Sequence, residues 1–127
     1  MKNLIFLLLP LILLSCSEDG NVTLQKCWTL AERGEDVQLY YLCDDERLGI
    51  SWFRPTYKFY SNNKCEYLVL HPADAHYMEE GVYEFNLETS KLTVKNTKGD
   101  LIANFKVLEI NSDQLKVEVL DGTYYAF

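Results

Sequence analysis

The sequence lacks the motifs that usually reveal an enzyme. It contains no Gly-x-Ser-x-Gly and no His-Glu-x-x-His, the arrangements that build a nucleophile elbow and a zinc protease site. No two cysteines have the Cys-x-x-Cys spacing typical of structural zinc sites. The carboxylate pairs Asp44-Asp45 and Glu79-Glu80 fall in predicted turns, where charge is normally solvated. We therefore expect no catalytic centre and no cofactor.

Long apolar runs are also scarce. The run at the N-terminus, from Leu4 to Leu14, has 11 residues and contains Pro10, whereas a membrane-spanning helix needs about 20. A basic residue, Lys2, precedes the run, and a small residue followed by polar chain comes after it. That order is typical of a secretory signal. Residues 1–15 are predicted to be a cleaved signal peptide.

The end of this run carries a second signal. Leu13-Leu14-Ser15-Cys16 resembles the lipobox of bacterial lipoproteins. The resemblance implies cleavage before Cys16, a diacylglycerol on its thiol and an acyl chain such as palmitate on its new amine. Two or more acyl chains anchor a protein firmly, so residues 16–24 are predicted to be a lipidated tether. Ser17 in place of aspartate favours the cell outer membrane, and Glu18-Asp19 resembles the surface-export signal of Bacteroidetes lipoproteins, so either face of that membrane stays open.

Positive charge is in short supply. The chain has 12 Lys and Arg against 19 Asp and Glu, a net charge of −7, and it shows no basic stripe. Nucleic acid repels such a surface, and charge alone would not hold the chain on anionic lipid. The expected membrane contact is therefore through the lipid. A stretch from His71 to His76 with Asp74 between them could hold a metal, but its spacing fits no known motif, so we predict a solvated loop and no metal.

No helical period runs through residues 25–127, and short alternating segments bounded by turn residues predict an all-β fold. Val37, Leu39 and Tyr41 should share one face of their strand, and the flip of apolar parity at Leu108 and Ile110 predicts a bulge or a bend. His71 to Glu80 is predicted to be a loop. Short turns favour an antiparallel meander closing into a small barrel or half-barrel. Helix is the alternative for part of residues 33–54. The expected strands cover residues 25–31, 37–43, 48–53, 56–60, 65–70, 81–87, 91–96, 101–110, 114–120 and 123–127.

One hairpin makes a prediction about a cysteine. Asn63 is expected in the left-handed conformation of a bulged turn, which puts Phe59, Cys65, Tyr57 and Tyr67 on one face. Cys65 should then be a buried, free thiol that acts as a small core hydrophobe. Only one pair can form within the chain among Cys27, Cys43 and Cys65, and a Cys43–Cys65 bridge remains the alternative.

A set of short segments along the chain carries a family resemblance. In order, they are Trp28, Tyr57-Lys58-Phe59, Cys65-Glu66-Tyr67, Gly81-Val82-Tyr83, Lys91-Leu92-Thr93-Val94, Val107-Leu108-Glu109 and Gln114-Leu115-Lys116-Val117. Their order and spacing resemble those of the small lipocalin-like lipoproteins of Bacteroidetes. The resemblance implies a lipocalin-like β-barrel domain over residues 25–127. Lys26 stands where lipocalins have a glycine before the tryptophan, and Asn63 stands at the usual turn glycine.

Aromatic side chains supply the functional hypothesis. An eight-stranded barrel can either fill with side chains or hold one small ligand. In the first interpretation a lipid-anchored monomer binds a small apolar or amphipathic molecule inside. In the second the barrel is filled and acts as a protein-interaction or inhibitor module of the outer membrane, and the interior volume decides between them. The side chains predicted to face inward and line the site are Trp28, Tyr57, Phe59, Tyr67, Tyr83 and Phe85.

Overall fold

The computed structural model describes residues 23–50, 53–70, 76–121 and 123. The predicted signal peptide (residues 1–15), the lipidation site Cys16 and residues 17–22 of the tether lie outside the described residues. So do residues 71–75, which include His71 and Asp74, and residues 124–127 of the expected last strand. In the described parts of the chain, no helix combines the length and the apolar character needed to cross a membrane.

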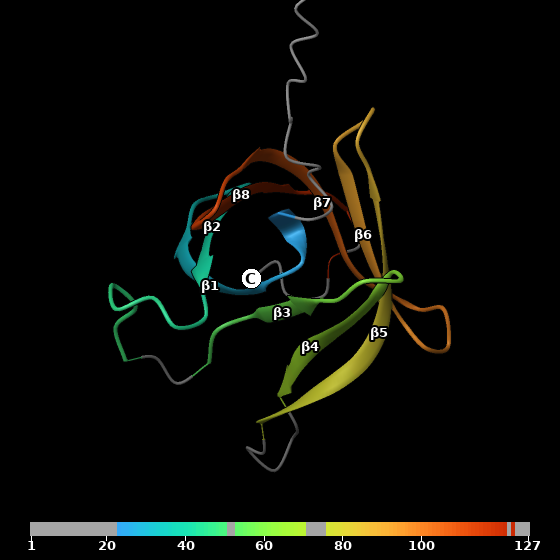
Figure 1. Cartoon of the computed structure of the whole chain (residues 1–127), viewed down its shortest axis with the longest axis horizontal. Helices are drawn as coiled ribbons and strands as arrows, with labels where there is room; N and C mark the ends of the chain where they lie inside the picture. The colour runs from blue at the N-terminus through green and yellow to red at the C-terminus, as the bar shows by residue number, and fades with distance from the viewer. Residues whose placement is uncertain (1–22, 51–52, 71–75, 122, 124–127) are drawn as a thin grey trace, which may run out of the picture.

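Eight antiparallel strands close into a barrel, which confirms the all-β prediction (Figure 1). In Figure 1 they form a ring around a short helical turn that ends at Leu24, just before β1. Inward and outward side chains alternate along them, as the burial of Leu92 and Val94 between exposed lysines of β6 shows. The strands are β1 (Cys27–Arg33), β2 (Val37–Leu42), β3 (Thr56–Phe59), β4 (Lys64–Leu70), β5 (His76–Asn86), β6 (Lys91–Asn96), β7 (Leu101–Ile110) and β8 (Gln114–Val119).

The strand order departs from a simple meander. Around the ring it is β1-β2-β8-β7-β6-β5-β4-β3, so β1 lies between β2 and β3, and β2 pairs with β8. An up-and-down barrel would place β2 beside β3 and β1 beside β8. Relative to that order, β1 and β2 have exchanged places.

The exchange explains the long segment between β2 and β3. Both strands run antiparallel to β1, so residues 43–55 must carry the chain back along the barrel. Residues 48–50 and Phe53 are not in a strand, so the predicted strand over residues 48–53 is wrong in its described part. Arg54 fastens the segment by donating hydrogen bonds to the Leu30 carbonyl (2.8 Å) and the Gly49 carbonyl (3.1 Å).

A salt bridge lies near the start of the same segment. The Arg47 guanidinium donates to the Asp45 carboxylate at 2.7 Å, and it lies 4.0 Å from the centre of the Tyr41 ring. Hydrogen bonds from Arg47 lower the pKa of Asp45 to about 2. The Tyr41 ring is therefore covered from outside the barrel.

This arrangement corrects the predicted face of β2. Gln38 and Tyr40 are the buried residues of the strand, while Val37, Leu39 and Tyr41 are only half-buried. Both parities of β2 carry apolar side chains, so alternation could not choose between them. The Tyr40 hydroxyl donates to Gln38 Oε1 at 2.7 Å, which lets both polar groups enter the core.

The hairpin between β3 and β4 has the predicted geometry. Asn63 has φ of 60°, and Asn62, which was not predicted, has φ of 62°. Phe59 pairs with Cys65, and Tyr57 with Tyr67. The predicted bulge in β7 is also confirmed, because its register with β8 shifts between Val107 and Glu109.

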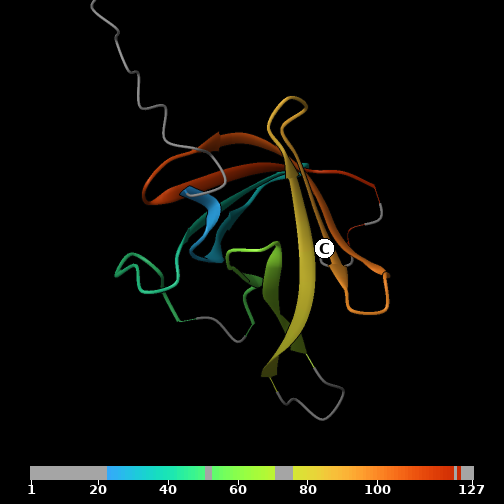
Figure 2. The same ribbon diagram turned by 45° about the vertical axis from the view of Figure 1, so that its right-hand side comes forward.

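The strand after this hairpin starts earlier than the sequence suggested. β5 begins at His76 and pairs with β4 back to Leu70, so the predicted loop is wrong from His76 to Glu80. The cross-strand partners Val69 and Tyr77 explain the extension, because a β-branched and an aromatic residue, both strand-forming, face each other there. The two strands reach down together at the bottom of Figure 2.

Candidate functional site

The six side chains predicted to line a cavity lie in the barrel interior. Five are buried, and Phe85 is half-buried and packed against the same core. Two partners that were not predicted as site residues join them, Tyr40 from β2 and Phe105 from β7. Alternation along β7 already pointed Phe105 inward, whereas nothing in the pattern of β2 singled out Tyr40.

Rings from opposite walls of the barrel touch at its centre. β3 and β7 are four strands apart in either direction around the ring of eight, which is as far apart as two strands can be. Nevertheless the rings of Tyr57 and Phe105 meet edge to face with centroids 5.7 Å apart. Tyr40 lies 6.0 Å from Tyr57 and 6.2 Å from Phe105. These are contact distances for aromatic pairs, so the middle of the barrel is filled by three rings.

The filling continues along β3. Phe59 stacks on Tyr57 with centroids 6.1 Å apart and meets Tyr83 at 4.8 Å. The Tyr83 hydroxyl donates to the Tyr60 carbonyl at 2.7 Å, so its polar end is satisfied within the protein. Burial is the main reason why the pKa of Tyr83 is raised.

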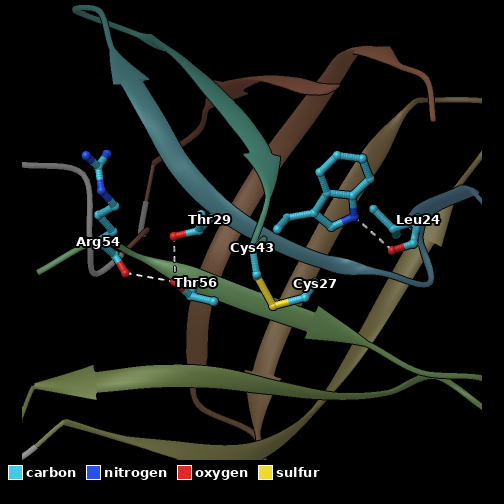
Figure 3. The surroundings of a disulfide bond; sticks show 7 residues. Leu24, Cys27, Thr29, Cys43, Arg54 and Thr56 are labelled. Atoms are coloured by element: carbon cyan, nitrogen blue, oxygen red, sulfur yellow. Dashed lines mark hydrogen bonds between the residues drawn. A yellow bond between two sulfur atoms is a disulfide. The ribbon is translucent and has the colours of Figure 1, made fainter. Parts of the chain in front are cut away.

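The helical turn before β1 also packs into the core. Leu24 is fully buried, although the tether was expected to extend to it. The fully buried Trp28 donates its indole N–H to the Leu24 carbonyl at 3.0 Å, which fixes the turn against β1. Figure 3 shows Leu24 beside the first strand.

One disulfide lies next to this turn. Cys27 and Cys43 are bonded across β1 and the end of β2, with their Cα atoms 5.4 Å apart (Figure 3), a usual spacing for a disulfide. The hydroxyls of Thr29 and Thr56 share a hydrogen bond of 2.8 Å between β1 and β3. β1, β2 and β3, whose order departs from that of a meander, are thus linked by side chains as well as by backbone hydrogen bonds.

The remaining described cysteine, Cys65, is expected to be unreactive. Cys65 is a free thiol and only 2 % exposed, as predicted. Burial, followed by the nearby Glu66 carboxylate, raises the pKa of its thiol to about 12. Since the thiolate is the reactive form, this cysteine is not a candidate nucleophile.

The outer face of the barrel carries a groove of about 850 Å³ over β5, β6 and β7. This volume falls within the range of ligand pockets. Most of its lining faces outward from the barrel, since Val82, Lys91 and Lys95 are all exposed, whereas Tyr83 at its floor is buried. A second hollow of about 170 Å³ continues it toward the β5–β6 turn. We call the larger hollow the outer groove; its lining includes Val82, Glu84, Lys91, Thr93, Lys95 and Asn104.

Among the described residues, no three side chains of His, Cys, Asp or Glu are placed to hold a metal ion. Comparison with known proteins finds no matching family model, no matching curated protein and no matching solved structure.

Proposed function

We propose that the chain is a lipid-anchored binding module of the cell envelope, whose filled barrel presents its outer surface to a ligand or partner. The observation that carries the proposal is the contact between Tyr57 and Phe105 across the barrel. A ligand in the middle would have to separate these rings and lose their packing. The proposal therefore favours the interaction-module hypothesis over a ligand held inside.

Export from the cytosol has support from two sources. The N-terminal segment up to Cys16 has the order of a lipoprotein signal. Independently, the Cys27–Cys43 disulfide lies at the barrel surface, where Cys43 is exposed. Such bonds persist in oxidising compartments, such as the bacterial periplasm and cell surface, and are rare in the cytosol.

The anchor is tested with Cys16→Ala. Because the lipid is the proposed attachment, the variant should fractionate as unprocessed precursor or soluble protein, while the wild type fractionates with the outer membrane. Cys65→Ala serves as the control, since it removes a cysteine without touching the signal. A Cys16→Ala protein that is still cut before residue 16 and recovered in the outer membrane would refute lipid anchoring.

The filled interior is tested with an amphipathic probe. A fluorescent fatty acid titrated into the purified protein should show no saturable binding with one site per chain. Saturable binding that is abolished by Tyr57→Phe or Phe59→Leu, in variants with unchanged circular dichroism, would favour the interior-ligand hypothesis instead.

A further inference from the structure

The outer groove is lined by more lysines than carboxylates, whereas the chain as a whole is acidic. Lys91 and Lys95 line it from β6, and Glu84 is the carboxylate among its lining residues. Lys91 also pairs directly with Lys106 of β7, and like charges in opposed cross-strand positions destabilise a sheet. Glu118 of β8 is the other cross-strand partner of Lys106 and offsets part of this repulsion. In a chain with a net charge of −7, this surface is suited to a negatively charged ligand.

The groove also offers the Glu84 carboxylate, a hydrogen-bond acceptor that a bare anion would not use. Thr93 and Asn104 are cross-strand partners at its centre, and Glu84 faces Thr93 from β5. A carboxylate only accepts hydrogen bonds, so a ligand that bonds to Glu84 has to donate them. Phosphate chains have no such donors at neutral pH, whereas the hydroxyl groups of a sugar do.

The shape of the groove indicates an elongated ligand. Lys91 and Lys95 are four residues apart on one strand, a separation of about 13 Å. The second hollow extends past Lys91 toward Thr89, and the exposed Val82 offers an apolar contact near Lys95. An oligosaccharide presents hydroxyl edges and apolar C–H faces in alternation, which matches this mixed lining.

We propose that the outer groove binds an acidic oligosaccharide, with Lys91 and Lys95 on two of its anionic groups and Glu84, Thr93 and Asn104 on its hydroxyls. The inference rests on the proposed function, because it names the ligand class of that outer surface. A carboxylated and a sulfated sugar share the chemistry that these residues recognise.

The test is a titration of the purified protein with an oligogalacturonate, a heparin-derived tetrasaccharide and neutral maltotetraose. At least one of the acidic sugars should bind, more weakly as salt is added, and the neutral sugar should not. The double variant Lys91→Gln/Lys95→Gln should weaken binding by about tenfold or more, because it removes two charge-assisted contacts. Whichever acidic sugar binds identifies the acid group.

Two controls separate the groove from charge in general and from the interior. Lys116→Gln removes an exposed lysine from β8 and should leave binding unchanged. Tyr57→Phe alters only the core and should also bind normally. Failure of both acidic sugars, or equal losses in Lys116→Gln and the groove variant, would overturn the inference and leave the proposed function standing. Binding lost in Tyr57→Phe but kept in the groove variant would overturn both.

Discussion

The inside of the barrel and the outer face of β5–β7 differ in how their polar groups are bonded. Inside, rings from opposite walls are in contact, and the polar ends of Tyr40 and Tyr83 bond to the protein itself. Outside, Lys91 and Lys95 of β6 line a groove, and Lys91 pairs with Lys106 of β7. Interior groups whose partners lie within the chain serve stability, whereas the exposed lysines of the groove serve the proposed binding of a ligand. Substitutions in the two regions should therefore have opposite consequences.

Removing the largest interior side chain should have the largest effect. Trp28→Ala should lower the free energy of unfolding by about 3 to 5 kcal/mol, because the indole is fully buried and bonded to Leu24. Chemical denaturation measures the change. Glu32→Ala, on the exposed end of the same strand, is the matched control and should stay within about 0.5 kcal/mol. Equal midpoints for the two variants would mean that the register of β1 is wrong.

The disulfide should come next. Replacing Cys27 and Cys43 together by serine should cost about 3 kcal/mol, the value for a closed loop of this length, since the bond spans 16 residues. Denaturation of the double variant against wild type gives the difference. Alkylation followed by mass spectrometry checks the pairing: Cys65 should react only after unfolding, and Cys27 and Cys43 only after reduction. A peptide joining Cys65 to either of them would contradict the pairing.

A smaller effect is expected at the rim, where inside and outside meet. Asn63→Ala should destabilise the protein by about 1 to 2 kcal/mol, because alanine in the left-handed conformation brings its Cβ close to a carbonyl oxygen. Asn63→Gly has no Cβ and should be as stable as wild type or nearly so. If alanine and glycine behave alike in thermal unfolding, the turn does not have the left-handed φ of 60°.

The smallest effect should lie in the outer groove. Lys91→Gln should leave stability unchanged or raise it by about 0.2 to 0.5 kcal/mol, because it removes a like-charge pair with Lys106. The midpoint of urea denaturation at low and high salt measures it, and the gain should shrink when salt screens the pair. A loss of 1 kcal/mol or more would mean that Lys91 serves the fold.

How far the sequence could predict this molecule depends on the element. Period-two alternation predicted β6, β8 and the β3–β4 hairpin with their correct faces, and the parity flip predicted the bulge in β7. Alternation shows which face of a strand is buried but not which strands are its neighbours. It therefore could not reveal that β1 lies between β2 and β3. It also failed on β2, where apolar residues occupy both parities.

For the candidate sites too, the sequence predicted which way single residues face but not which residues the paired strands bring together. The inward aromatic residues were predictable one by one, but their contact across the barrel depends on strand order and on Tyr40, which the sequence did not indicate. The outer groove was not predicted at all. Its lysines belong to β6 and its polar partners to β5 and β7, so only the paired strands bring them together. The alternation of Lys91, Thr93 and Lys95 was visible in the sequence as an ordinary solvated face.

The filled interior is tested most directly by nuclear Overhauser effects between the ring protons of Tyr57 and Phe105 in solution. With the two centroids 5.7 Å apart, cross-peaks between the rings should be present, and they should persist when a saturating amphipathic probe is added. Absent cross-peaks, or cross-peaks that disappear as the probe binds, would show an interior that opens to a ligand and would contradict the account.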